Sequence, residues 1–198
     1  MNNIVFIEGI SGVGKTTTTT QLANKLRDMG YKISCYLEGA NDNPLDPFGG
    51  KYPPVMPISE FAEAYLQCWQ NFMKATFEND FMIVDGTLLH HQINDLLREY
   101  SASDEIIANQ LSNLMQVIKQ LNPVIFYLSA SDVKQRLAQA RKSRKQSAPT
   151  EERIEFWENR KRVDLYVLDR LPIDSHILCV DNGWSAVLET MVECIRGV

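Results

Sequence analysis

Short hydrophobic runs recur along this chain, and each has the length of a β-strand. The first, at residues 3–8, reads NIVFIE and is almost continuous in apolar residues, which is typical of a strand covered on both faces. Four later runs of the same kind predict strands at 32–37, 81–84, 124–128 and 176–180. The pattern therefore indicates a sheet of five strands.

Between these runs, the hydrophobic residues follow helical spacing. Leu22, Leu26 and Met29 share one face of a predicted helix at 15–29, which ends before Gly30. Further helices are expected at 58–79 with Ser59 as N-cap, across much of 88–121 with a break near 101–104, and at 132–144, 151–171 and 184–195. Strands that alternate with helices predict an α/β protein, a three-layer α/β/α fold with a parallel sheet.

Two irregular segments interrupt this alternation. The stretch at 38–57 is rich in Gly, Pro, Asn and Asp and is longer than a simple connection, so we expect it to be functional. The segment KQSAPT at 145–150 is a flexible break, which we interpret as part of a mobile lid at about 138–150. The length of 198 residues is that of one domain, so we expect a single domain over 1–198.

Composition and charge limit the kinds of molecule that the protein is expected to bind. The net charge of −5 argues against a nucleic-acid-binding protein, yet residues 134–162 hold ten Lys and Arg against four acidic residues. Such a basic block in an acidic chain favours a small anionic ligand. The four cysteines form no CxxC pair and are expected to be free, buried thiols in a reducing compartment. No apolar run approaches the length of a membrane span, and the expected location is the cytoplasm.

The strongest motif follows the first predicted strand directly. Residues 9–16 read GISGVGKT and match the phosphate-loop (P-loop) pattern G-x-x-x-x-G-K-[ST] at every fixed position. Its glycines let backbone N–H groups converge on a phosphate, and the following helix aims its N-terminus at the same anion. Lys15 would reach the β- and γ-phosphates, and Thr16 would offer a hydroxyl to Mg²⁺. The predicted nucleotide-binding residues are Gly9, Ile10, Ser11, Gly12, Val13, Gly14, Lys15, Thr16 and Thr17.

The motifs that mark other classes of nucleotide-binding protein are absent from this sequence. Asn24-Lys25-Leu26-Arg27 misses the Asp of the base-reading N-K-x-D of GTPases and lies within a predicted helix. The L-S-G-G-Q element of transporter ATPases is absent. What remains is a small-molecule kinase.

The layout resembles the thymidylate kinase and deoxynucleoside kinase branch of the P-loop kinases. The segments that carry the resemblance are the opening IEG with GVGKTT at 7–17, YLEG at 36–39, MIVD at 82–85, and FYL at 126–128 followed by Asp132 and Arg136. The resemblance implies ATP and Mg²⁺ as cofactors, a basic lid whose arginines clamp the transferred phosphate, and a possible homodimer. Two family features are missing, because the third strand ends in Asp85-Gly86 rather than Asp-Arg, and Glu38 is not followed by Pro-Gly-Gly-Thr.

Five side chains are candidates for catalysis. Asp85 closes a strand and would support Mg²⁺ together with Thr16, although an Asp-Gly pair also forms turns. Glu38 would position or deprotonate the acceptor, or else is a solvated loop acid. Lys15 and either Arg141 or Arg144 would stabilise the transferring phosphoryl group. Arg160 and Arg162 are expected at the surface.

The acceptor site is less clear. Related kinases place aromatic residues and a glutamine on the helix after the long loop, so Glu38, Tyr65, Trp69 and Gln70 are the candidates, with core packing as the alternative for the aromatic pair. Trp184 could flank the adenine or pack in the core. The three histidines lack the spacing of zinc ligands. Residues 38–99 hold ten acidic residues and three basic ones, which favours a neutral or cationic acceptor.

The function predicted from the sequence is ATP- and Mg²⁺-dependent phosphoryl transfer to a small acceptor, a nucleoside or a nucleoside monophosphate. The alternatives are a P-loop kinase for an antibiotic, a sugar or a cofactor precursor, and a nucleotide-binding switch without turnover. Neither nucleic acid nor a membrane is expected as a partner.

Overall fold

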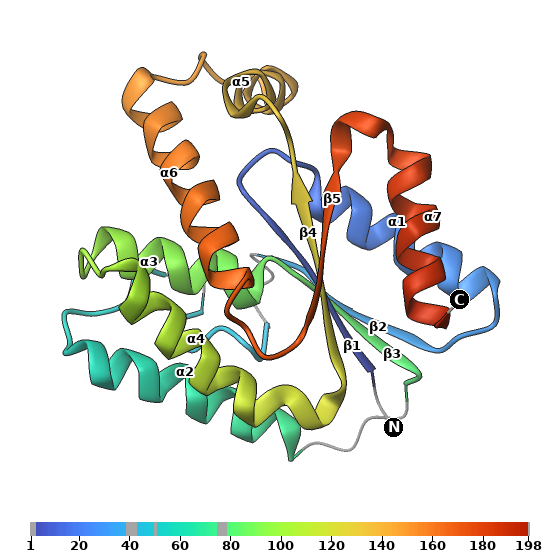
Figure 1. Ribbon diagram of the computed structural model, residues 1–198, viewed down its shortest axis with the longest axis horizontal. Coiled ribbons are helices and arrows are strands. Elements are labelled where there is room, and N and C mark those ends of the chain that lie inside the picture. The colour runs from blue at the N-terminus through green and yellow to red at the C-terminus, as the bar shows by residue number, and fades with distance from the viewer. Residues whose placement is uncertain (1–2, 39–42, 50, 75–78, 198) are drawn as a thin grey trace.

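The computed structural model describes residues 3–38, 43–49, 51–74 and 79–197, and all five predicted strands lie within these ranges. The strands are β1 (Asn3–Gly9), β2 (Ile33–Tyr36), β3 (Phe81–Asp85), β4 (Pro123–Ser129) and β5 (Asp174–Cys179). They form one parallel sheet in the order β2-β3-β1-β4-β5 (Figure 1). The expected five-stranded parallel sheet is therefore confirmed.

The register of the sheet decides which residues meet at its carboxyl edge. Ile7 of β1 pairs with Asp85 at the end of β3, and Gly9 pairs with Leu128 of β4. The first residues of the P-loop therefore leave the sheet beside Asp85. The β1 residues Ile4 to Ile7 are fully buried, which is the reason for the continuous apolar run in the sequence.

Helices cover both faces of the sheet (Figure 1). They are α1 (Lys15–Asp28), α2 (Ile58–Met73), α3 (Gln92–Arg98), α4 (Asp104–Ile118), α5 (Val133–Ser143), α6 (Glu151–Leu168) and α7 (Trp184–Arg196). One hydrophobic cluster joins the sheet to α2, α3, α4 and α6, and a second joins it to α1, α5 and α7. The N-terminal part of α6 also reaches the second cluster through Ile154 and Trp157, so this helix bridges the two layers.

Three helices begin with a side-chain cap that the sequence encodes. Ser103, Asp132 and Thr150 accept the backbone N–H three residues later at the starts of α4, α5 and α6. The prediction of Ser59 as the N-cap of α2 is wrong, because this helix already starts at Ile58 with Pro57 as its cap. Its predicted end at Asn79 is also wrong, because α2 ends at Met73, and 75–78 lie outside the described residues.

The predicted helical region 88–121 divides into several pieces. A π-helical turn, η1 (Thr87–His91), leads directly into α3, and the chain then breaks before α4, where the break near 101–104 was expected. Two short 3₁₀ turns also occur. The first, η2 (Lys119–Leu121), precedes β4, and the second, η3 (Val180–Asn182), follows β5. The turn η1 lies directly after β3 and so stands beside the P-loop.

All four cysteines are free, as expected, but they are half-buried rather than fully buried. Among the described residues, no helix combines the length and the apolar character that a membrane span needs. The predicted lid region comprises the second half of α5 and the segment that leads into α6. Its mobility stays a prediction.

Candidate active site

The P-loop connects β1 to α1 through glycines in conformations that other residues rarely adopt. Gly12 and Gly14 have φ angles of 85° and 90°. There is also no space for side chains, because a Cβ atom on Gly12 would lie 2.8 Å from Cβ of Ala140, and one on Gly14 would collide with the ring of Trp184. The loop is thus enclosed by α5 on one side and by Trp184 on the other.

A cavity of about 370 Å³ opens at this loop. Its lining includes eight residues that the sequence singled out: Ser11, Gly12, Gly14, Lys15, Thr16, Thr17, Glu38 and Arg144. His90, Ala140 and Ser143 complete it. Residues far apart in the sequence therefore meet at the carboxyl edge of the sheet, as parallel strand topology predicts.

Lys15 is buried and held from several sides. Its Nζ atom lies 3.2 Å from the carbonyl oxygen of Gly9, to which it donates, and 3.3 Å from Oε2 of Glu38. Glu38 follows β2 and remains 30% exposed, so its carboxylate faces the cavity. The pair brings the predicted phosphate-binding cation and the predicted general base into direct contact.

Thr16 and Asp85 form the predicted metal-binding pair. The Thr16 hydroxyl donates a 2.6 Å hydrogen bond to Oδ2 of Asp85, while Oδ1 of the same carboxylate is buried with no hydrogen-bond partner among the described residues. Burial raises the pKa of Asp85, and the Thr16 hydroxyl and the Lys15 charge oppose this shift. An orphaned carboxylate oxygen beside a hydroxyl fits Mg²⁺, which prefers oxygen ligands and retains several waters. No group of three or more metal-ligating side chains occurs in the described ranges.

His90 belongs to this site, although the sequence pointed to it only as an unsuitable zinc ligand. Its Nδ1 lies 3.3 Å from Nζ of Lys15, and its Nε2 lies 3.4 Å from Oε1 of Glu38. Burial lowers the pKa of His90 well below its usual range, and the charges of Lys15 and Arg160 add to the effect. A neutral ring that accepts from Lys15 at Nδ1 and donates to Glu38 from Nε2 satisfies both contacts. The ring also stacks on Trp157, at 5.4 Å between centroids.

Glu8, the last side chain before the P-loop, fixes the position of η1. Its carboxylate is fully buried and accepts the backbone N–H groups of Leu88, Leu89 and His90, at 2.8 to 3.1 Å. Burial raises its pKa to about 8, against the opposing effects of the Leu89 N–H and the Lys15 charge. These N–H groups have no partner within a helical turn, so Glu8 provides the acceptor they need. Strand β1 thereby holds His90 in place.

A buried ion pair supports the same turn from α6. Arg160 donates to Asp164, and through its other nitrogen to the carbonyl oxygen of Leu89 at 2.8 Å. Asp164 also accepts a 2.8 Å hydrogen bond from the Tyr127 hydroxyl. The expectation that Arg160 lies at the surface is therefore wrong, because this side chain is fully buried. Arg162 is exposed as expected and pairs with Asp104.

The kinases that the sequence resembles have arginine at the position of Gly86, and the structure explains why this protein has glycine there. Its φ angle is +62°, and a Cβ atom there would lie 2.6 Å from Oε2 of Glu38 and 2.9 Å from Cε of Lys15. The Lys15–Glu38 contact thus occupies the space that a side chain at position 86 would need.

The arginines at 136, 141 and 144, in and next to the predicted lid, have three different settings. Arg144 lines the P-loop cavity. Arg141 instead lines a neighbouring cavity and donates to the carbonyl oxygen and hydroxyl of Ser147. Arg136 pairs with Asp181 at 2.8 Å, which ties α5 to the segment after β5.

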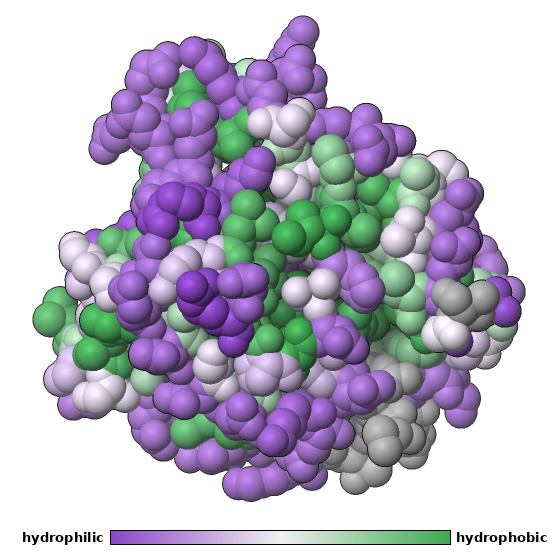
Figure 2. Space-filling model, viewed as in Figure 1, coloured by the Kyte–Doolittle hydropathy of each residue, from purple (hydrophilic) through white to green (hydrophobic). Residues whose placement is uncertain are grey.

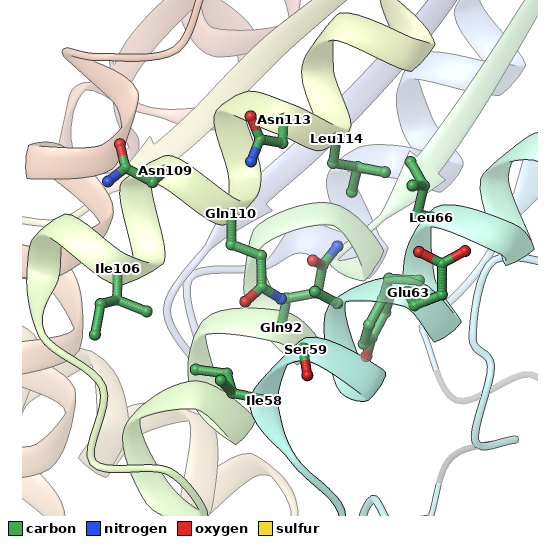
Figure 3. A pocket seen from close by; sticks show the side chains of 12 residues that line it. Ile58, Ser59, Glu63, Leu66, Gln92, Ile106, Asn109, Gln110, Asn113 and Leu114 are labelled. Carbon is green, nitrogen blue, oxygen red and sulfur yellow. The ribbon is translucent and has the colours of Figure 1, made fainter.

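The remaining candidates lie in or near the core. Trp69 is fully buried, with its ring 5.7 Å from that of Phe6. Tyr65 is 2% exposed and lines a groove between α2 and α4, where Figure 3 shows Gln92 and Gln110 directed into the space. Gln70 is half-buried on α2. Trp184 packs against the P-loop at Gly14, and neither Tyr65, Trp69 nor Gln70 lines the P-loop cavity.

Comparison with known proteins identifies the fold. No protein-family model matches the sequence, and no curated protein matches it. The structure does match solved structures. One is deoxyadenosine kinase from M. mycoides with dCMP and a flexible dCDP bound, with a TM-score of 0.58 and 16% identity over 98% of this chain and 100% of that one. The same enzyme with dATP gives 0.55 and 19% over 98% and 99%, and thymidylate kinase from Ehrlichia chaffeensis gives 0.56 and 14% over 98% of each chain. The expected fold of P-loop nucleoside and nucleotide kinases is confirmed.

Proposed function

We propose that the protein is a kinase that transfers the γ-phosphoryl group of ATP, with Mg²⁺, to a nucleoside or a nucleoside monophosphate. The observation that carries the proposal is the convergence of Lys15, Thr16 and Glu38 on one cavity at the P-loop, with the buried Asp85 hydrogen-bonded to Thr16. The fold shared with nucleoside and nucleotide kinases supports it.

Each of these side chains has its own role in the proposed phosphoryl transfer. The P-loop N–H groups and Lys15 bind the β- and γ-phosphates, which requires the Lys15 ammonium to exchange its contact with Glu38 for phosphate oxygens. An acceptor oxygen attacks the γ-phosphorus, the bond to the β-phosphate oxygen breaks, and ADP leaves with the electron pair. For a hydroxyl acceptor, Glu38 takes the proton.

Thr16 and Asp85 would hold Mg²⁺, directly or through water, because their oxygen atoms adjoin the phosphate-binding loop. When bound there, the ion neutralises charge on the phosphates. Arg144 lines the same cavity and would face the transferring phosphoryl group. A cation at this place stabilises the charge that develops in the transition state more than it stabilises the ground state.

The test is transfer of label from γ-labelled ATP to a panel of nucleosides, nucleoside monophosphates, sugars and antibiotics. Wild type is compared with Lys15→Ala and with Lys25→Ala, which removes an exposed lysine of α1. We expect a labelled nucleoside or nucleotide with wild type and Lys25→Ala, and none with Lys15→Ala at an unchanged melting temperature. Full activity in Lys15→Ala contradicts the proposal, as does label found only as free phosphate.

A further inference from the structure

The Glu38 carboxylate contacts a different side chain with each of its two oxygens. Oε2 lies 3.3 Å from Nζ of Lys15, and Oε1 lies 3.4 Å from Nε2 of His90. Glu38 is 30% exposed and lines the P-loop cavity, whereas Lys15 and His90 are buried. Two buried groups therefore hold one accessible carboxylate.

Binding of ATP would remove one of these two contacts. In the proposed function, the Lys15 ammonium leaves Oε2 of Glu38 and moves to the phosphates of the donor. The carboxylate then loses its ion pair at the stage when it must act on the acceptor. Among the described residues, His90 is the partner that remains to it.

The His90 ring is held by β1 and α6. Its backbone N–H donates to Oε2 of Glu8 at 3.1 Å, and Arg160 donates to the carbonyl oxygen of the preceding residue, Leu89, at 2.8 Å. The ring stacks on Trp157 with an interplanar angle of 18°. Hydrophilic residues cover the projecting end of the molecule that α5 and the start of α6 form (Figure 2), yet Trp157 is only 3% exposed. It therefore supports the His90 ring from the interior.

Position 86 cannot share the task of holding Glu38. A Cβ atom on Gly86 would lie 2.6 Å from Oε2 of the carboxylate, so the glycine leaves room for the Lys15–Glu38 contact but provides no hydrogen-bond donor from a side chain. His90, four residues later on η1, does provide one. A neutral ring that accepts from Lys15 at Nδ1 carries its proton on Nε2, the atom that faces Glu38.

We propose that His90 is the positioning residue of Glu38. Its Nε2–H keeps Oε1 of the carboxylate in place, while Oε2, released by Lys15 when ATP binds, takes the proton of an acceptor hydroxyl. The acceptor O–H bond breaks, its oxygen forms the new bond to the γ-phosphorus, and the bond to the β-phosphate oxygen breaks, with its electron pair leaving on ADP. The inference rests on the proposed kinase function and adds that the base becomes free only after the donor has bound.

The same arrangement distinguishes two kinds of acceptor. A hydroxyl must lose a proton as it attacks, so it needs a base. The oxygen of an ionised phosphate has no proton to lose and would be repelled by the Glu38 carboxylate. A base held in place for the reaction therefore fits a hydroxyl acceptor such as a nucleoside, in agreement with the ten acidic and three basic residues at 38–99.

The experiment is a double-mutant cycle between His90 and Glu38, with transfer from γ-labelled ATP to nucleosides as the measurement. His90→Phe keeps a ring against Trp157 but removes both nitrogens. We expect its kcat to fall about 100-fold while the KM for ATP stays within about threefold of wild type. In a Glu38→Gln background, the same change should lower kcat less than about twofold, because His90 acts through Glu38. Losses that multiply in the double variant would overturn the proposal.

Three further variants complete the test. His90→Gln retains an amide N–H and should recover at least about tenfold of the rate lost in His90→Phe. His90→Leu removes both nitrogens in a smaller side chain and should match His90→Phe, so it takes the place of that variant if melting curves show that the phenylalanine disturbs the fold. His91→Asn is the control and should stay within about twofold of wild type, because His91 lies outside the described lining of the P-loop cavity.

The possible results separate the two proposals. Full kcat in His90→Phe, or a raised KM for ATP as its only effect, would overturn the role of His90 and leave the kinase function standing. Transfer by wild type to nucleoside monophosphates alone would do the same. Absence of transfer from wild type to any acceptor contradicts the kinase function, and the role of His90 falls with it.

Discussion

Replacing Gly86 with alanine tests whether the Lys15–Glu38 contact requires an empty position after β3. Gly86 has a φ angle of +62°, and the new Cβ would lie 2.6 Å from Oε2 of Glu38 and 2.9 Å from Cε of Lys15. Both distances are shorter than van der Waals contact. The Glu38 carboxylate and the Lys15 chain must therefore move, and both belong to the proposed catalytic machinery.

The expected cost has two parts. A left-handed backbone conformation at a residue other than glycine costs about 1–2 kcal/mol, which lowers the melting temperature of a protein of this size by about 2–4 °C per kcal/mol. The second part affects catalysis, because a displacement of about 1 Å in a positioned group can cost about 100-fold in rate, or about 2.7 kcal/mol in the barrier. We therefore expect a modest loss of stability and a loss of about 100-fold in kcat/KM.

Gly30→Ala is the matched control, because Gly30 has a φ angle of +92° and a Cβ there meets no atom within 4 Å. It carries the backbone cost without the collision. Melting curves and kcat/KM are measured for both variants and for wild type. Equal melting temperatures for the two variants with a rate loss only in Gly86→Ala support the reasoning. Wild-type kcat/KM in Gly86→Ala refutes it.

Three other changes address metal binding, pH dependence and the buried ion pair. Asp85→Asn should raise the Mg²⁺ concentration for half-maximal activity about 10- to 100-fold without changing metal-free ATP binding by calorimetry; an unchanged Mg²⁺ titration would exclude Asp85 as a metal partner. Because the Glu8 pKa is raised from 4.5 to about 8, its protonated form stabilises the fold fully below pH 4.5, and this stability is lost as pH rises to 8, by at most about 1.4 kcal/mol per pH unit. Urea unfolding should show Glu8→Gln with a flatter pH profile, and a slope equal to that of wild type would contradict the shift. Asp164→Ala should cost about 3–5 kcal/mol of unfolding free energy because Arg160 stays buried without its partner, whereas Arg160→Met with Asp164→Leu should recover much of it; a loss below about 1 kcal/mol would show that the pair is not needed.

Much of the site could be predicted from the sequence, since its parts are contiguous or end a strand. The P-loop is one continuous motif, and Asp85 is the last residue of a buried run, so topology alone brings it beside Thr16. Glu38 follows β2 in the same way and reaches Lys15. These placements need only parallel strands whose carboxyl ends share an edge.

The missed residues depend on tertiary detail. His90 enters the site because η1 is a π-helical turn held by Glu8, and no pattern in the sequence indicates that turn. For Arg160 a signal existed, because it stands four residues before Asp164 and shares a helix face with Trp157 and Val167, which are apolar. The gathering of Arg98, Arg141 and Arg153 around one cavity could not be found by counting charges along segments, since these residues come from three helices.

The position of the tryptophans gives this protein a built-in optical reporter. Trp184 packs against the P-loop at Gly14, and Trp157 stacks on His90, so two indole rings lie next to residues that line the P-loop cavity. Trp69 lies fully buried beside Phe6 and would contribute a constant emission background. Ligand occupancy can thus be followed by intrinsic fluorescence without labelling. The emission of Trp157 would also be sensitive to the protonation of His90, so a change at the P-loop cavity could be followed in the unmodified chain.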